Sequence, residues 1–121
     1  MVDDAKIESI IQSIIREFKT VGVDKVILFG SWAKGNASEN SDIDLIVVAP
    51  KDDISSGFRE KMNLYLRYNQ HIKAFKAEVP IDLIVYTRAG FKKLLEMDSL
   101  FVRDILKTGK VLYEANNQGV A

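Results

Sequence analysis

Short β-rich runs alternate with segments of helical periodicity along this chain, and that alternation most strongly limits the folds available to it. Residues 23–29, 42–48 and 79–86 are short runs rich in Val, Ile and Leu, as expected for strands. A helix before them is marked by apolar residues at i, i+3, i+4 and i+7: Ile7, Ile10, Ile11, Ile14, Ile15, Phe18 and Val21. The alternation predicts a mixed α/β (α+β) domain.

The rest of the chain continues this pattern. A second helix is expected after Pro50, with one buried face: Ile54, Phe58, Met62, Tyr65, Leu66, Asn69 and Ile72. Two short helices and a last strand at 110–113 follow, and we expect their aromatic residues to be core: Phe91, Phe101 and Tyr113. Residues 1–114 are predicted to form one domain, and 115–121 a flexible tail.

Composition excludes several classes of protein. The chain has 121 residues, 47% of them hydrophobic, which suits one domain with a real core. Its 17 basic residues balance 17 acidic ones, so a basic, sequence-blind nucleic-acid binder is not expected. The chain has no cysteine, which excludes disulfides and zinc-thiolate sites. It has a single histidine, His71, which excludes a His-rich metal site. No apolar run reaches the ~18–20 residues that span a bilayer. The acidic start is unlike a signal peptide, so we expect a cytoplasmic protein without a membrane partner.

Three acidic residues interrupt or precede the apolar strands. Asp42 and Asp44 are two residues apart on one predicted strand, so their side chains share a face. Asp82 lies in another predicted strand, where an isolated carboxylate is costly unless exposed or paired. If the two strands are neighbours, these carboxylates form a cluster that could hold two Mg²⁺ ions for phosphoryl or nucleotidyl transfer.

A turn after the first strand supplies candidate phosphate ligands. Gly30 allows close approach of the backbone to a phosphate, Ser31 adds a hydroxyl donor, and Lys34 could neutralise phosphate charge. Each feature alone has an ordinary explanation: a simple turn, loop capping by Asp42 and Asp44, or an exposed edge carboxylate at Asp82. The neighbouring Trp32 could stack on a base or pack on the core, and packing is favoured.

The sequence GSWAKG at residues 30–35, followed by SDIDLIV at 41–47, resembles the signature of the DNA polymerase β-like nucleotidyltransferase superfamily. The short chain is similar to its minimal nucleotidyltransferases (MNT). The motif covers residues 29–48 and is extended by Asp82. The resemblance implies a small mixed sheet with helices packed on one side.

The resemblance also implies an activity, the Mg²⁺-dependent transfer of a nucleoside monophosphate to a hydroxyl with release of pyrophosphate. Gly30 and Ser31 would hold the triphosphate, with Lys34 as an accessory. Asp42 and Asp44 would bind the metals, and Asp82 would bind the metal nearer the acceptor and help to deprotonate it.

Many minimal members resemble antitoxins that use ATP to AMPylate a tyrosine of a HEPN ribonuclease toxin. By this resemblance we expect an AMPylating antitoxin that forms a hetero-complex with its HEPN partner. Two alternatives stay open: a binding module that inhibits its partner by contact alone, and a nucleotidyltransferase that acts on a small molecule.

Overall fold

The protein folds around one four-stranded mixed sheet with the strand order β3-β2-β1-β4. A computed structural model describes residues 4–38, 40–50 and 57–115. In chain order, its elements are α1 (Asp4–Val21), β1 (Lys25–Phe29), α2 (Ser31–Lys34), β2 (Ile43–Val48), α3 (Phe58–Asn69), α4 (Lys73–Lys76), β3 (Ile81–Tyr86), α5 (Arg88–Glu96), α6 (Leu100–Thr108) and β4 (Lys110–Glu114). Strand β1 is antiparallel to both β2 and β4, whereas β2 and β3 are parallel.

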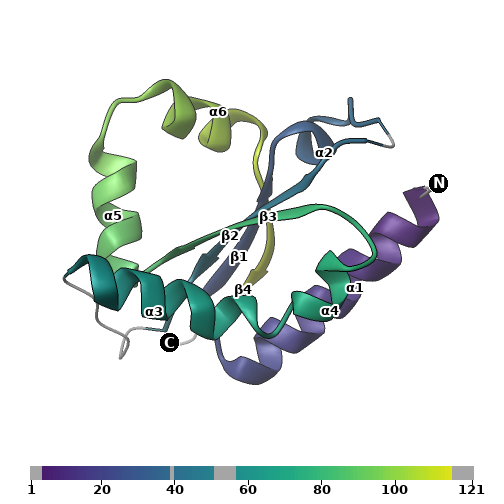
Figure 1. The fold of residues 1–121 in the computed structure, drawn as a ribbon. Coiled ribbons are helices and arrows are strands. Elements are labelled where there is room, and N and C mark those ends of the chain that lie inside the picture. Colours follow the sequence, from purple (N-terminus) through teal and green to yellow (C-terminus); the bar gives the residue numbers. More distant parts are fainter. Residues whose placement is uncertain (1–3, 39, 51–56, 116–121) are drawn as a thin grey trace.

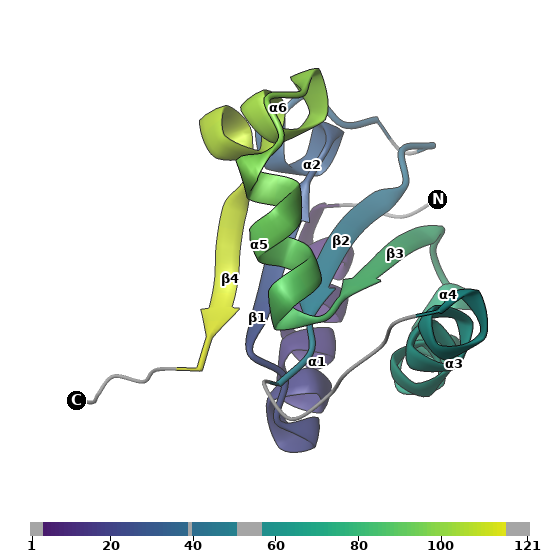
Figure 2. The same ribbon diagram turned by 90° about the vertical axis from the view of Figure 1, so that its left-hand side faces the viewer.

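Helices cover both faces of this sheet, as Figures 1 and 2 show. Alternate residues of β2 divide between two cores, because successive side chains of a strand point to opposite faces. Ile43, Leu45 and Val47 join the larger core with α1 and α3. Ile46 and Val48 join a smaller core with residues of α5 and α6.

The expected mixed α/β sheet is confirmed, but the expectation of helices on one side was incomplete. The second layer of helices is explained by the apolar residues on both faces of β2. Because Ile46 and Val48 are apolar as well, β2 reads as a strand buried on both faces, and its second face needs a cover of its own.

Helix α1 forms as its apolar spacing predicts. It buries one stripe on the larger core: Ile7, Ile10, Ile11, Ile14 and Phe18. Gly22 follows the helix with a φ of 92°, a conformation that glycine adopts at little cost, and its amide donates to the carbonyl of Phe18.

The buried face predicted for the second helix was wrong in part, since Tyr65 packs against the larger core and Asn69 is half-buried, but other members are exposed. Helix α3 buries Leu64 and Tyr68, whereas Phe58, Met62 and Leu66 are 82%, 44% and 52% exposed. Two apolar stripes overlap on this helix, and the one that packs is set by its position beside β3, which the period alone does not specify. Among the other expected core residues, Ile72 is buried but follows α3, and Ile54 lies outside the described residues.

The C-terminal segment closes the sheet. Phe91 of α5 is buried, while Phe101 and Tyr113 are partly buried against the two cores. After β4, the amide of Ala115 donates to the carbonyl of Asp24 at 2.9 Å. The rest of the predicted tail, residues 116–121, lies outside the described residues. None of the helices in the described ranges is long and apolar enough to cross a bilayer.

Candidate active site

The three acidic residues meet at one end of the sheet. Asp44 is the second residue of β2 and Asp82 the second residue of β3. The parallel register pairs Asp44 directly with Asp82, so both carboxylates emerge on the same face. Asp42 immediately precedes β2. The structure therefore brings together the carboxylates that the sequence analysis singled out, on the face that α5 and α6 partly cover.

The carboxylates that meet at this end of the sheet repel one another. Partial burial raises the pKa of Asp44, and the nearby charges of Asp82 and Asp42 raise it further. Asp42 and Asp82 are themselves exposed to solvent. A cation, or a ligand that brings one, would relieve the repulsion at this point.

The Gly30–Ser31 turn lies against the same carboxylates. Gly30 follows β1, whose last residue, Phe29, is paired with Asp44 across the antiparallel ladder. Gly30 has a φ of 76°, and a β-carbon at this position would overlap Oδ2 of Asp44. A glycine is therefore required both by the backbone conformation and by the nearby carboxylate.

Ser31 begins α2 directly after this glycine. The carbonyl of Gly30 accepts from the amides of Ala33 and Lys34, which closes the turn. The amides of Ser31 and Trp32 lie in the first turn, where a helix offers no internal acceptor. The turn adjoins the carboxylates through Gly30, which lies against Asp44.

Lys34 ends α2 and takes part in an ion pair. Its Nζ lies 3.3 Å from Oδ2 of Asp104 on α6, and both side chains are partly exposed. A phosphate would have to compete with Asp104 for this lysine. Sequence reasoning missed Asp104, and no sequence signal could have found it, because its role depends on how α6 packs beside α2.

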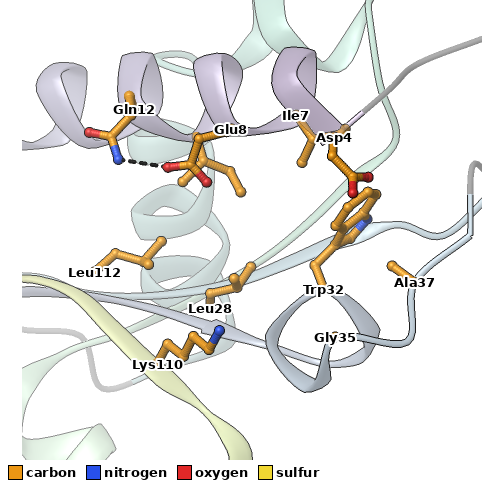
Figure 3. A pocket seen from close by; sticks show the side chains of 11 residues that line it. Asp4, Ile7, Glu8, Gln12, Leu28, Trp32, Gly35, Ala37, Lys110 and Leu112 are labelled. Carbon is orange, nitrogen blue, oxygen red and sulfur yellow. Dashed lines mark hydrogen bonds between the residues drawn. The ribbon is translucent and has the colours of Figure 1, made fainter.

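Trp32 packs on the core, in agreement with the favoured interpretation. Its side chain reaches toward α1 beside a pocket of about 340 Å³ (Figure 3). Its indole Nε1 donates to the carbonyl of Ser41 at 3.3 Å. Trp32 therefore lies on the opposite face of the sheet from the carboxylates.

The carboxylates suit a cation that arrives with a phosphate ligand. In the described parts of the chain, no three acidic or histidine side chains are arranged to hold an ion by themselves. Mg²⁺ commonly takes only one or two protein carboxylates and completes its shell with water and phosphate oxygens. The adjacent Asp44 and Asp82 provide such a donor pair. His71 takes no part, because its Nδ1 lies 3.0 Å from Oε2 of Glu17 on α1.

Comparison with known proteins gives matches over most of the chain. Residues 10–118 match the family model described as "Polymerase beta, Nucleotidyltransferase". Two Methanocaldococcus jannaschii relatives are both named "Putative protein adenylyltransferase". MJ0604 is 36% identical over 75% of this chain and 79% of its own length. MJ1379 is 31% identical over 76% of this chain and 94% of its own length.

A solved structure shares the fold at low sequence identity. It is described as a toxin-antitoxin with AMP-PNP, and the alignment has a TM-score of 0.52 at 20% identity. It covers 85% of this chain and 72% of that one.

Proposed function

This chain belongs to the polymerase beta nucleotidyltransferase family, and on that premise we propose that it transfers AMP from ATP to a hydroxyl group of a partner protein. The observation that carries the proposal is the direct register pairing of Asp44 with Asp82 beside Gly30. Carboxylates and a turn that begins with a glycine lie together at one end of the sheet, and they suit a nucleoside triphosphate and an attacking hydroxyl.

The proposed roles follow from position. Gly30 and Ser31 bind the triphosphate through backbone amides and the serine hydroxyl, and Lys34 adds a positive charge. Asp82 is the exposed member of the pair, so it is the better placed to orient the acceptor hydroxyl and take its proton. The acceptor oxygen forms a bond to the α-phosphorus while the bond from this phosphorus to the pyrophosphate oxygen breaks.

Asp42, Asp44 and Asp82 are the proposed holders of Mg²⁺. When bound, the metal would neutralise charge on the phosphates and on the carboxylates together. Asp44 benefits most, since it is the least exposed of the three and is flanked by the other two.

A protein acceptor is supported by the names of the two archaeal relatives, which describe protein adenylyltransferases. The toxin-antitoxin description of the structural neighbour supports a toxin as the partner. We propose a tyrosine of a HEPN ribonuclease as the acceptor, and AMPylation as the means by which the toxin is silenced. The AMP-PNP in that neighbour supports an adenine nucleotide as the donor.

The test is a labelling experiment with the position of the label varied. The purified protein and Mg²⁺ are incubated with extract from the source cells and either α-³²P-ATP or γ-³²P-ATP, then resolved on a denaturing gel. A protein band labelled only from α-³²P-ATP supports AMP transfer. Mass spectrometry of that band then identifies the acceptor residue.

Matched variants test whether the proposed site produces the labelled protein band. Asp42→Ala/Asp44→Ala should abolish the labelled band, whereas Glu96→Ala/Asp98→Ala removes two exposed acids elsewhere and should leave it unchanged. Persistence of the band in Asp42→Ala/Asp44→Ala contradicts the assignment. A partner that is bound but never labelled favours inhibition by contact alone, and label confined to a small molecule favours the third alternative.

A further inference from the structure

The indole of Trp32 joins the two segments that carry the proposed site. Trp32 follows Ser31 of the phosphate turn, and it donates to the carbonyl of Ser41, the residue before Asp42. We propose that Trp32 is a positioning residue that sets Asp42 relative to the Gly30–Ser31 turn. The inference rests on the proposed function, because it concerns how the nucleotide and its metal are held.

The segment between α2 and β2 has few other links to the rest of the protein. Ser38 and Ser41 close a local turn, in which the amide of Ser41 donates to the carbonyl of Ser38 at 3.0 Å. The hydroxyl of Ser41 accepts from the amide of Ser38 at 2.9 Å. Among the hydrogen bonds described for residues 37–42, the one from Trp32 is the bond that reaches outside this turn.

Trp32 is itself held by the core, which makes it a suitable anchor. Its ring is partly buried against the larger core, beside Leu28 and Ile7. The pocket next to it leaves room on the α1 side, as Figure 3 shows. The core packing holds the ring, and the indole N–H is its one hydrogen-bond donor, so the bond to Ser41 ties that carbonyl to the core.

The anchor opposes a force that acts on Asp42. Asp42 is exposed and lies two residues from Asp44, so the two negative charges are close and repel each other. On the other side of Asp42, the amide of Ile43 donates to the carbonyl of Pro80 at 2.9 Å. The bond from Trp32 to Ser41 therefore restrains the side of Asp42 that leads back to the phosphate turn. The metal-dependent part of nucleotide binding should depend on the restraint, whereas direct contacts of the phosphates with the turn should not.

The test replaces the indole N–H and keeps the ring. In one variant, benzothienylalanine replaces Trp32, which substitutes sulfur for the N–H in a ring of the same shape. Trp32→Phe is the genetically encoded counterpart, which also removes the N–H but leaves a smaller ring. ATP affinity is measured by titration calorimetry, with Mg²⁺ and with Mg²⁺ removed by chelation. We expect metal-free affinity to stay within about twofold, and the gain from Mg²⁺ to fall about three- to tenfold.

A purely structural role would lower both affinities together or leave both unchanged, and either result would overturn the inference. Asp44→Asn separates this failure from failure of the proposed function. If the wild-type protein gains affinity with Mg²⁺, Asp44→Asn loses that gain and the Trp32 variants keep it, then only the positioning role is wrong. If the wild-type protein binds no ATP under either condition, the proposed function and this inference both fail.

Discussion

The α-carbon of Gly30 lies so close to the carboxylate of Asp44 that any side chain at position 30 would overlap Oδ2 of the aspartate. The antiparallel pairing of Phe29 with Asp44 creates this approach. The turn proposed to bind phosphate and the acid proposed to bind metal are thus in van der Waals contact. A substitution at Gly30 should therefore move the carboxylate of Asp44.

Substitution of Gly30 by Ala should cost stability and displace Asp44 together. The φ of 76° alone imposes strain of about 1–3 kcal/mol on an alanine, and the overlap with Asp44 adds to it. We expect a lower midpoint of thermal unfolding and loss of ATP binding by titration calorimetry.

Gly22→Ala is the matched control for that variant. Gly22 has a φ of 92° but no atom within 4 Å of an added β-carbon. It should cost only the backbone strain, about 1–2 kcal/mol, and bind ATP normally. Equal effects of the two substitutions on ATP binding would contradict the contact with Asp44.

Asp44→Asn should stabilise the metal-free protein at neutral pH. The raised pKa means that the folded state binds this proton more tightly than the unfolded state. The free energy of unfolding therefore falls as the pH rises from the ordinary pKa of Asp through the raised pKa of folded Asp44. Asn removes that loss, so the variant should unfold at a higher temperature than the wild type.

The stabilisation should disappear in acid. Well below the ordinary pKa of 3.8 for an aspartate, Asp44 is protonated in both states, and the wild type and the variant should converge. Thermal unfolding in chelator, measured from pH 7 downward, follows this difference. An Asp44→Asn variant that is less stable than the wild type at pH 7 would show that the carboxylate contributes favourable contacts.

Lys34 and Asp104 should have opposite effects on nucleotide affinity. Their ion pair of 3.3 Å is partly exposed, so breaking it changes stability by less than about 1 kcal/mol. Lys34→Met should weaken ATP binding about three- to tenfold, because a charge-assisted contact is lost. Asp104→Asn should strengthen it by up to about fivefold, because Lys34 no longer has to leave a partner.

The double variant distinguishes competition from independent effects. If Asp104 acts only through Lys34, Lys34→Met/Asp104→Asn should bind ATP like Lys34→Met alone. Titration calorimetry without metal isolates these phosphate contacts. Unchanged affinity in Lys34→Met would show that the lysine pairs with Asp104 but does not bind the nucleotide.

Two leucines on α3 should differ sharply in their contribution to stability. Leu64 is 4% exposed, and Leu64→Ala should reduce the free energy of unfolding by about 2–5 kcal/mol through the cavity it leaves. Leu66 is 52% exposed, and Leu66→Ala should change it by less than about 0.5 kcal/mol. Urea unfolding measures both, and equal losses would contradict the difference in burial between the two leucines.

The proposed site could be predicted from the sequence because each of its parts has a local signal. Asp42, Asp44 and Asp82 stand out among apolar neighbours, and a two-residue spacing on a strand determines a shared face. That β3 lies beside β2 was stated as a condition, and the register of Asp44 with Asp82 meets it.

What the sequence could not specify depends on contacts between distant elements. The face of α3 that is buried, the second layer formed by α5 and α6, and the pairing of Lys34 with Asp104 all follow from how helices are placed on the finished sheet. Apolar periodicity shows that a helix has a face to bury, but not which of two overlapping stripes meets the sheet.

Asp24, at the other end of β1, connects several segments at once. Its amide donates to Val48 and its carbonyl accepts from Ala115, while its carboxylate pairs with Arg88 at the start of α5. Two backbone bonds and an ion pair therefore meet at this one residue. At the opposite end, the amide of Ile43 bonds to the carbonyl of Pro80, and the side chains of Trp32 and Lys34 add further links. The loss of any one of these links leaves the others in place, so the amides of Asp24 and Ala115 should exchange their hydrogens more slowly than those of an ordinary surface loop.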